Sequence, residues 1–315
     1  SSSQGKENAP PPEEIEREIF QGSEGAEFHG MQVSEHEEGS ASGHRPSAIE
    51  NENNLKRLFS RTTRSTELDP PPGFFASLTN NYLVHREQVQ VTPELKTLLD
   101  NIHGNFVLDI IPFSLFSKFE RIFLMLFRTK EKYTGFTSRP PWSIATTNIE
   151  EQSIYIMENN EFNSNFVHEL SHIYYDGFFK PTITPLWLSE GYATYMQVNA
   201  QTPEQRTWIN HGLNTFLSGE YIAFDEFVNA ENLKSYQQDD VLLWYVQAYS
   251  VINYLLKTKS KDEFYQFSKN LKDGMPVTRA MYRAYGMPFN TLSALEHAWY
   301  ADLINTAKQE KRGQG

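Results

Sequence analysis

The sequence has 315 residues and contains no cysteine. This absence excludes disulfide bonds, a thiol nucleophile and every zinc site built from cysteine, although it does not fix the cellular compartment. Positive charge is also scarce, because 28 Lys and Arg stand against 40 Asp and Glu and give a formal net charge of −12. Nucleic acid is therefore not an expected partner, since its binding requires a concentrated basic surface.

Long hydrophobic runs are missing as well. The best candidate, Ile122–Phe127, has only six residues, whereas a membrane-spanning helix needs about 20. We therefore expect no transmembrane segment and interpret this run as a buried strand. Hydrophobic residues still make up 39% of the chain and aromatic residues 14%, which is enough for a sizeable core.

Residues 1–72 differ in composition from the rest of the chain. They are rich in Ser, Gly, Glu, Pro and Asn, and their 14 acidic and 7 basic side chains give a net charge of −7. Such a segment cannot bury enough apolar surface to order itself, so we predict a disordered tether, with order beginning near Pro70–Phe75. A Ser-rich tether is typical of a bacterial lipoprotein that lacks its signal peptide and lipidated cysteine. We therefore expect an exported periplasmic or surface protein with a lipid anchor upstream; an intracellular enzyme with a disordered arm is the alternative.

Residues 73–160 show a mixed pattern that predicts a small sheet-containing lobe. A helix is predicted after Thr92, which is a good N-cap and is followed by Pro93 in the first turn. A second helical stretch is expected at Ser114–Glu120. Strands are expected at Asn81–Val91, Phe106–Phe113 and Arg121–Thr129, and as a hairpin over Trp142–Met157. Residues 161–308 are helix-rich, and residues 309–315 are predicted to be a disordered tail.

The segment Asn165–Met196 carries the clearest chemical signal, and it reads NFVHELSHIYYDGFFKPTITPLWLSEGYATYM. His168 and His172 are four residues apart, so on a helix both imidazoles lie on one face and can bind one ion. Glu169 projects about 100° around the helix from His168. It can therefore lie beside the ion without binding it, where the general base for a water molecule belongs.

Two helices are predicted around this motif. The first is capped by Asn163 or Ser164 and ends at Asp176–Gly177. The second starts with Thr184 as its cap and Pro185 in its first turn, after a loop of about ten residues.

Glu190 on the second helix is the predicted third ligand. Two imidazoles and one carboxylate leave a fourth position for water, which is the arrangement of a catalytic zinc site. Zinc is preferred because the ligands are nitrogen and oxygen and the chemistry needs a Lewis acid without redox activity. The alternative is a chance HExxH match, with surface residues and one buried histidine.

At these residues the sequence resembles the gluzincin metallopeptidases. The pattern HELSH…WLSEGYATY is similar to the signature of the aminopeptidase N family, and closer still to the smaller peptidase MA-like domains of many bacterial proteins. Those domains combine the motif with a downstream helix that resembles WYVQAYSVINYLL at Trp244–Leu256. The resemblance extends over roughly residues 80–303 and implies a thermolysin-like α+β fold.

Two departures from the aminopeptidase N pattern bear on specificity. Seventeen residues separate His172 from Glu190, where that family has eighteen. That family also binds the substrate amine through G-x-M-E-N, whereas Met157–Asn159 lacks the preceding glycine and lies close to His168. We interpret this MEN as a coincidence, so the resemblance does not imply an exopeptidase.

The resemblance also implies roles for individual residues. Glu169 would take a proton from the zinc-activated water and deliver it to the leaving amine. A tyrosine at the start of the downstream helix would donate to the oxyanion, with Tyr245 as the best match and Tyr249 as the alternative. Apart from the resemblance, Thr194 lies four residues after Glu190 on the same helical face and is a candidate partner for a ligand histidine. His211 is a weaker candidate for a second oxyanion donor.

These observations predict a zinc-dependent peptidase that binds one Zn²⁺ and acts on a peptide or protein, with an endopeptidase favoured. The alternatives are an exopeptidase with a different amine anchor, a binding or surface-interaction protein with an idle metal site, and a zinc hydrolase of another substrate such as cell-wall peptide. The predicted fold is α+β, with a small mixed N-terminal sheet and a mostly helical C-terminal lobe. The last strand of the sheet is expected to border the cleft, where an extended substrate could pair with it.

Overall fold

The computed structural model describes residues 69–114, 116, 118, 120–139, 143–233, 236 and 238–313. The tether predicted for residues 1–72 lies almost entirely outside these described residues. The exported location and lipid anchor depend on that segment and stay predictions. At the other end, helix α13 (Leu292–Gly313) continues beyond Lys308, where helical sequence was expected to stop.

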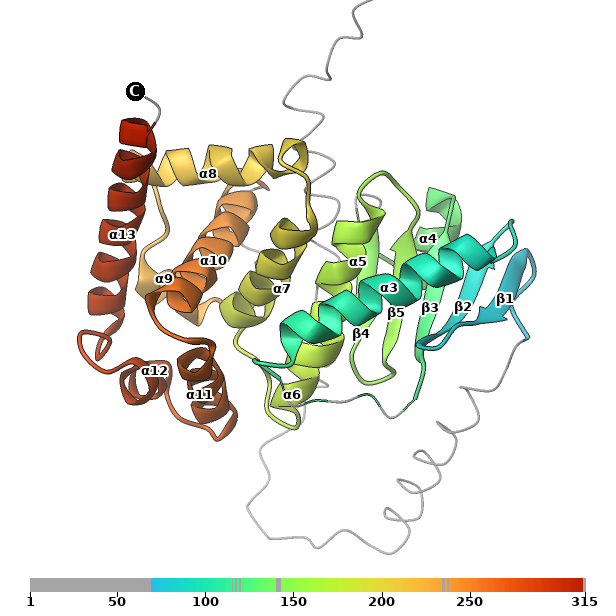
Figure 1. The fold of residues 1–315 in the computed structure, drawn as a ribbon, viewed down its shortest axis with the longest axis horizontal. Helices are drawn as coiled ribbons and strands as arrows, with labels where there is room; N and C mark the ends of the chain where they lie inside the picture. Colours follow the sequence, from blue (N-terminus) through green and yellow to red (C-terminus); the bar gives the residue numbers. More distant parts are fainter. Residues whose placement is uncertain are drawn as a thin grey trace, which may run out of the picture.

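The N-terminal part forms one mixed five-stranded sheet (Figure 1). Its spatial order is β1-β2-β3-β5-β4, with β2, β3 and β5 parallel and the two edge strands antiparallel to their neighbours. The hairpin and the Ile122–Phe127 strand are confirmed, but the last strand in sequence is not at the edge. The strands are β1 (Phe74–Leu78), β2 (Tyr82–Glu87), β3 (Ile122–Phe127), β4 (Ala145–Asn148) and β5 (Ser153–Met157).

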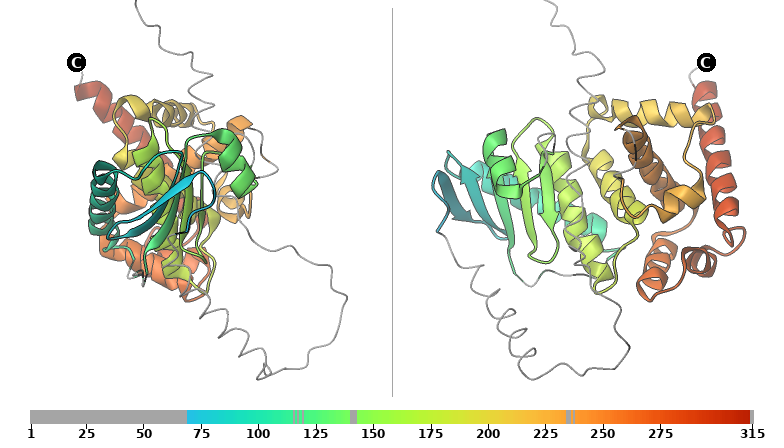
Figure 2. Two further views of the ribbon diagram at one scale, coloured as in Figure 1. Left: turned by 90° about the vertical axis from the view of Figure 1, so that its right-hand side faces the viewer. Right: turned by 180° about the vertical axis from the view of Figure 1, so that it is seen from behind.

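The two faces of the sheet pack against different helices (Figures 1 and 2). Side chains alternate between faces along a strand. In β3, Leu124 and Leu126 join the main core, which also holds residues of α3 (Pro93–Ile110) and α5 (Phe162–Ser171). Met125 and Phe127 point to the opposite face, where they pack with Tyr133 of α4 (Lys130–Thr137).

Helix α3 confirms one sequence prediction and corrects another. Thr92 is its N-cap and accepts from the backbone N–H of Leu95 at 3.3 Å, with Pro93 in the first turn. The strand predicted at Phe106–Phe113 is wrong, because α3 continues to Ile110. The buried positions of α3 show why: they follow the helical period, at Leu99, His103, Phe106 and Ile110. In the stretch Ser114–Glu120, the described residues are not helical.

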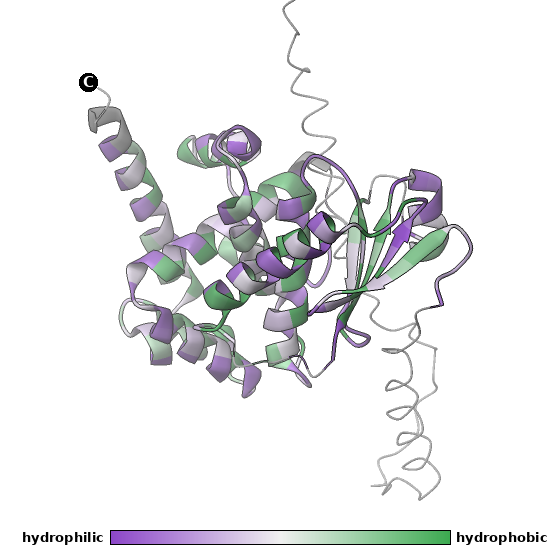
Figure 3. Cartoon of the chain, turned by 45° about the vertical axis from the view of Figure 1, so that its right-hand side comes forward, coloured by the Kyte–Doolittle hydropathy of each residue, from purple (hydrophilic) through white to green (hydrophobic). Residues whose placement is uncertain are grey.

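The C-terminal part is helical and packs around the long helix α10 (Gln238–Thr258). The mixed sheet followed by this helical region confirms the predicted α+β architecture. Figure 3 shows hydrophobic strands in the sheet, while the outer helices alternate hydrophilic and hydrophobic residues. The described residues include no helix with the length and apolarity needed to cross a membrane. The other helices here are α7 (Leu186–Ala200), α8 (Thr207–Leu217), α9 (Phe224–Asn229), α11 (Lys261–Lys272), α12 (Val277–Tyr285) and α13.

A buried Tyr–His–Tyr chain connects the sheet to the helix that follows the HExxH motif. The Tyr82 hydroxyl lies 2.5 Å from Nδ1 of His103, and the Tyr174 hydroxyl lies 2.9 Å from Nε2 of the same ring. A neutral imidazole offers one donor and one acceptor, which matches these two partners. Burial and the nearby Lys118 lower the pKa of His103 to about 4.

This low pKa predicts that the protein loses stability as the pH falls from about 6.5 to 4. In that range His103 takes up a proton in the unfolded chain but not in the fold, so the unfolded state gains stability. Over this pH range, the difference between the two pKa values of His103 should lower the free energy of unfolding by up to about 3 kcal/mol. Urea unfolding between pH 7 and pH 4 measures it, with His103→Gln as the reference. Parallel pH dependence in the wild type and the variant would contradict this assignment.

Candidate metal site

The helix that carries the HExxH motif begins earlier than predicted. Helix α5 starts at Phe162, after Glu161, and no side chain caps it. Ser164 cannot act as the predicted cap, because its hydroxyl donates to the Glu161 carbonyl at 3.0 Å and already lies inside the first turn. Asn163 is likewise inside the helix.

The helix also changes its geometry at the second histidine. After Ser171 it continues as a π-helical turn, η2 (His172–Asp176), and then as α6 (Gly177–Phe179), so it extends past the predicted end at Asp176–Gly177. Short π-helical segments of this kind are frequent at functional sites. This turn begins at His172 and ends at Asp176, whose carboxylate contacts the His172 ring.

Helix α7 carries Glu190, the predicted third ligand. It begins at Leu186, one residue later than predicted, with Pro185 at the cap position, while the buried Thr184 hydroxyl has no hydrogen-bond partner. The connection from α6 covers only residues 180–185, shorter than expected. Lys272 holds its start by donating to the backbone carbonyls of Phe178 and Lys180.

A close crossing with α10 fixes the position of α7. A Cβ atom at Gly191 would lie 2.8 Å from both the Ala248 carbonyl oxygen and a side-chain carbon of Ile252 on α10. Only glycine therefore allows the two helices to approach this closely. Glu190, the adjacent residue, is held at the level of the histidines by this contact.

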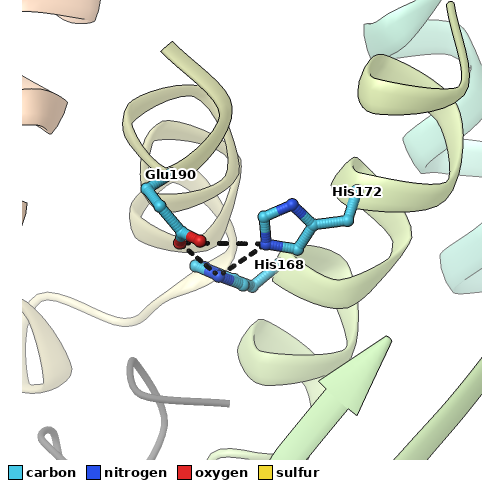
Figure 4. A group of neighbouring side chains, drawn as sticks. All are labelled: His168, His172 and Glu190. Atoms are coloured by element: carbon cyan, nitrogen blue, oxygen red, sulfur yellow. Dashed lines mark hydrogen bonds and ion pairs between the residues drawn. The ribbon is translucent and has the colours of Figure 1, made fainter. Parts of the chain in front are cut away.

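The structure brings His168, His172 and Glu190 together (Figure 4). The two Nε2 atoms are 3.2 Å apart, and Oε2 of Glu190 lies 3.5 Å from the first and 3.8 Å from the second. All three residues are buried, with at most 5% of their surface exposed. Within the described part of the chain, this is the one group of acidic, histidine or cysteine side chains with a geometry that could hold a metal ion.

Hydrogen bonds donated by the outer nitrogens orient both rings. Nδ1 of His168 lies 3.0 Å from Oε1 of Gln197, and Nδ1 of His172 lies 2.8 Å from Oδ2 of Asp176. The Gln197 amide is oriented in turn, because its Nε2 donates to Oδ1 of Asn165 at 2.9 Å. Because Oε1 of Gln197 and Oδ2 of Asp176 are acceptors, each Nδ1 donates a proton to its partner, and each Nε2 is directed into the cluster, where a neutral imidazole could bind an ion.

This donor set fits a divalent cation. The two Nε2 atoms approach each other to 3.2 Å, and the buried Oε2 of Glu190 has no hydrogen-bond partner. Burial alone lowers the pKa of His172, but the carboxylates of Glu190 and Asp176 outweigh burial and raise the pKa to about 10. The site therefore attracts positive charge. In a tetrahedral zinc site, bond lengths near 2 Å place two ligand nitrogens about 3.3 Å apart, close to the distance found here.

The sequence analysis missed the residues that orient the histidines. It proposed Thr194, but the Thr194 hydroxyl is buried without a hydrogen-bond partner. Asp176 could have been found from its spacing of four residues from His172. Asp176 also accepts from the Ser189 hydroxyl at 2.7 Å, a contact between η2 and α7 that depends on how the two segments pack.

Glu169 lies outside the three-residue cluster, on the side of the sheet. It is 1% exposed, and its Oε2 accepts from the hydroxyl of Thr147 in β4 at 2.5 Å. Its charge also contributes to the raised pKa of His172, so the carboxylate is close to the ligand rings.

The predicted oxyanion donors occupy different environments. Tyr245 is 4% exposed on α10, with its ring edge-on to Trp244, and Tyr249 stacks on Tyr195 of α7. They flank Ala248, which contacts α7, so both belong to the α7 side of α10. His211 is exposed on α8. The role of each of these residues stays a prediction.

Taken together, the mixed sheet, the helical lobe and the buried His–His–Glu cluster define an α+β protein with a candidate metal-binding site. The family model of the Peptidase MA superfamily matches residues 129–305, more than half of the 315 residues, and the chain belongs to this superfamily. The match covers all three cluster residues and Glu169, and it indicates a peptidase. No curated protein matches the chain.

The geometry predicts that metal binding stabilises the fold and depends on the partner of His172. After treatment with a chelator, adding Zn²⁺ should raise the melting temperature, because the ion binds only the folded chain. Asp176→Asn should weaken zinc affinity by about 10- to 100-fold, and Glu190→Gln should weaken it further. His297→Ala is the control, since that residue is exposed on α13. Equal zinc affinity of Asp176→Asn and the wild type would contradict the orienting role.

Proposed function

We propose that the chain is a zinc-dependent peptidase that cleaves peptide bonds with an activated water. The observation that carries the proposal is the convergence of the Nε2 atoms of His168 and His172 on a buried oxygen of Glu190 that has no hydrogen-bond partner, with Glu169 next to His168 on the helix. Membership of the Peptidase MA superfamily supports hydrolysis of peptides or proteins.

His168, His172 and Glu190 would hold the ion. Zinc, when bound, supplies Lewis acidity, which lets a water molecule lose a proton near neutral pH and so become a good nucleophile. The hydrogen bonds that both rings donate to Gln197 and Asp176 fix the ring orientations, so the ligands would not have to reorganise when the ion binds.

Glu169 would act as the general base. A general base must reach the water without occupying a ligand position, and Glu169 lies between His168 and His172 in the helix without belonging to the cluster. It would accept the proton from water and pass it to the nitrogen of the leaving amine. A purely structural metal site has no use for such a carboxylate.

Tyr245 is the proposed oxyanion donor, with Tyr249 as the alternative. Tyr245→Phe should lower kcat by about 100-fold or more while zinc binding is retained, because only the donated hydrogen bond is lost. Tyr249→Phe, which removes the hydroxyl of the ring stacked on Tyr195, should change kcat by no more than a few fold. The opposite ranking of the two variants would transfer the role to Tyr249.

The strand order favours an endopeptidase. Strand β4, rather than the predicted last strand β5, is the edge strand next to α5. An extended substrate could add to this edge by backbone pairing and continue on both sides of the scissile bond. The MEN segment offers no free amine anchor, because the Glu158 carboxylate pairs with Arg86 of β2 at 2.9 Å.

The decisive test is Glu169→Gln, assayed on a broad peptide library at matched zinc content. The variant should bind zinc as well as the wild type and lose about 10²- to 10⁴-fold in kcat, because the proton acceptor is gone. Glu131→Gln, an exposed change on α4, is the control. Internal cleavage sites support an endopeptidase, whereas N-terminal trimming alone would contradict it. Bound zinc without Glu169-dependent turnover on the library would refute the peptidase proposal and favour a binding protein.

A further inference from the structure

We propose that Thr147 is a positioning residue for the general base and couples it to the edge strand on which substrate binds. This inference rests on the proposed function, since it assigns Glu169 the role of proton acceptor. It concerns a side chain of the sheet that no part of the HExxH motif contains.

The first support is the contact itself. The Thr147 hydroxyl lies 2.5 Å from Oε2 of Glu169 and 3.2 Å from the backbone carbonyl of the same residue. An O–H···O⁻ distance near 2.5 to 2.7 Å is typical of a charge-assisted hydrogen bond, so the proton is donated to the carboxylate. The contact joins β4 to α5, and its two residues are 22 positions apart in sequence.

This contact leaves Glu169 little freedom. The carboxylate is 1% exposed, and the hydroxyl fixes one of its oxygens. A glutamate has three side-chain torsions, and general-base catalysis depends on a narrow range of positions relative to the water. A donor on a strand of the sheet is a rigid support for such a group.

The second support is the direction of the Thr147 backbone. Met157 N–H donates to the Ile144 carbonyl, so Ile144 faces β5, and backbone direction alternates along an antiparallel strand. The N–H and carbonyl of Ala145 and Thr147 are therefore directed away from β5, toward the open edge. The Ala145 carbonyl already accepts from the Ser143 hydroxyl at 3.2 Å.

Thr147 thus combines two functions in one residue. Its backbone is directed to the edge where an extended peptide would pair, while its side chain holds the carboxylate that would accept the proton. A substrate strand paired with Thr147 would lie at a fixed offset from Glu169. The position of the scissile bond would then be set by the register of pairing on β4.

The test compares Thr147→Val, which removes the hydroxyl at nearly constant shape, with Thr147→Ser, which keeps it. Thr146→Val is the matched control, because Thr146 is the neighbouring residue, points to the other face and accepts from Arg139 instead. Each protein is loaded with zinc, and kcat and KM are measured on one cleaved peptide. Crystal structures of the metal-free wild type and Thr147→Val provide a readout that does not depend on activity.

Thr147→Val should lower kcat by about 10- to 100-fold with KM and zinc content nearly unchanged, and the Glu169 carboxylate should leave its wild-type position. Thr147→Ser should restore most of the kcat, and Thr146→Val should match the wild type. A kcat for Thr147→Val within twofold of the wild type would overturn the inference, as would an unmoved carboxylate. If instead wild-type turnover proves independent of Glu169, the proposed function itself fails, which is a separate result.

Discussion

The candidate site depends on one electrostatic constraint, the convergence of two imidazole rings and a buried carboxylate on a common point. Such a group is unfavourable in a protein interior unless a cation joins it. Its geometry follows from two helices. The spacing of His168 and His172 places both rings on one face of α5. The close crossing of α7 and α10 at Gly191 places Glu190 of α7 opposite the two rings.

Much of this site could be predicted from the sequence, because it follows from spacing within helices. His168, His172 and Glu190 needed only helical periodicity and a short connection. Gln197 and Thr147 could not be found in that way, since their contacts cross from α7 and β4 to α5. Those contacts depend on how separate elements pack, which local pattern does not specify.

The fold shows the same division. Strand β3 and the β4–β5 hairpin were evident from their apolar residues and turn, and the α+β class followed from them. The apolar run at Phe106–Phe113 was misinterpreted because its composition suits a strand, whereas the spacing of buried residues along α3 is helical. Sheet order was equally out of reach. Strand β5 pairs in parallel with β3 and on its other side with β4, and this long-range pairing is what leaves β4 at the edge.

The π-helical turn makes the two histidines unequal. His172 takes its orientation from Asp176, four residues away in the same turn, whereas His168 takes its orientation from Gln197 on the neighbouring helix. Separation of α5 from α7 would remove Gln197 from His168 and withdraw Glu190 at the same time. It would also remove Ser189 from the His172 ring, but the hydrogen bond of that ring to Asp176 would remain. The ring of His172 would thus stay oriented toward a cation when the other two residues of the cluster had moved apart.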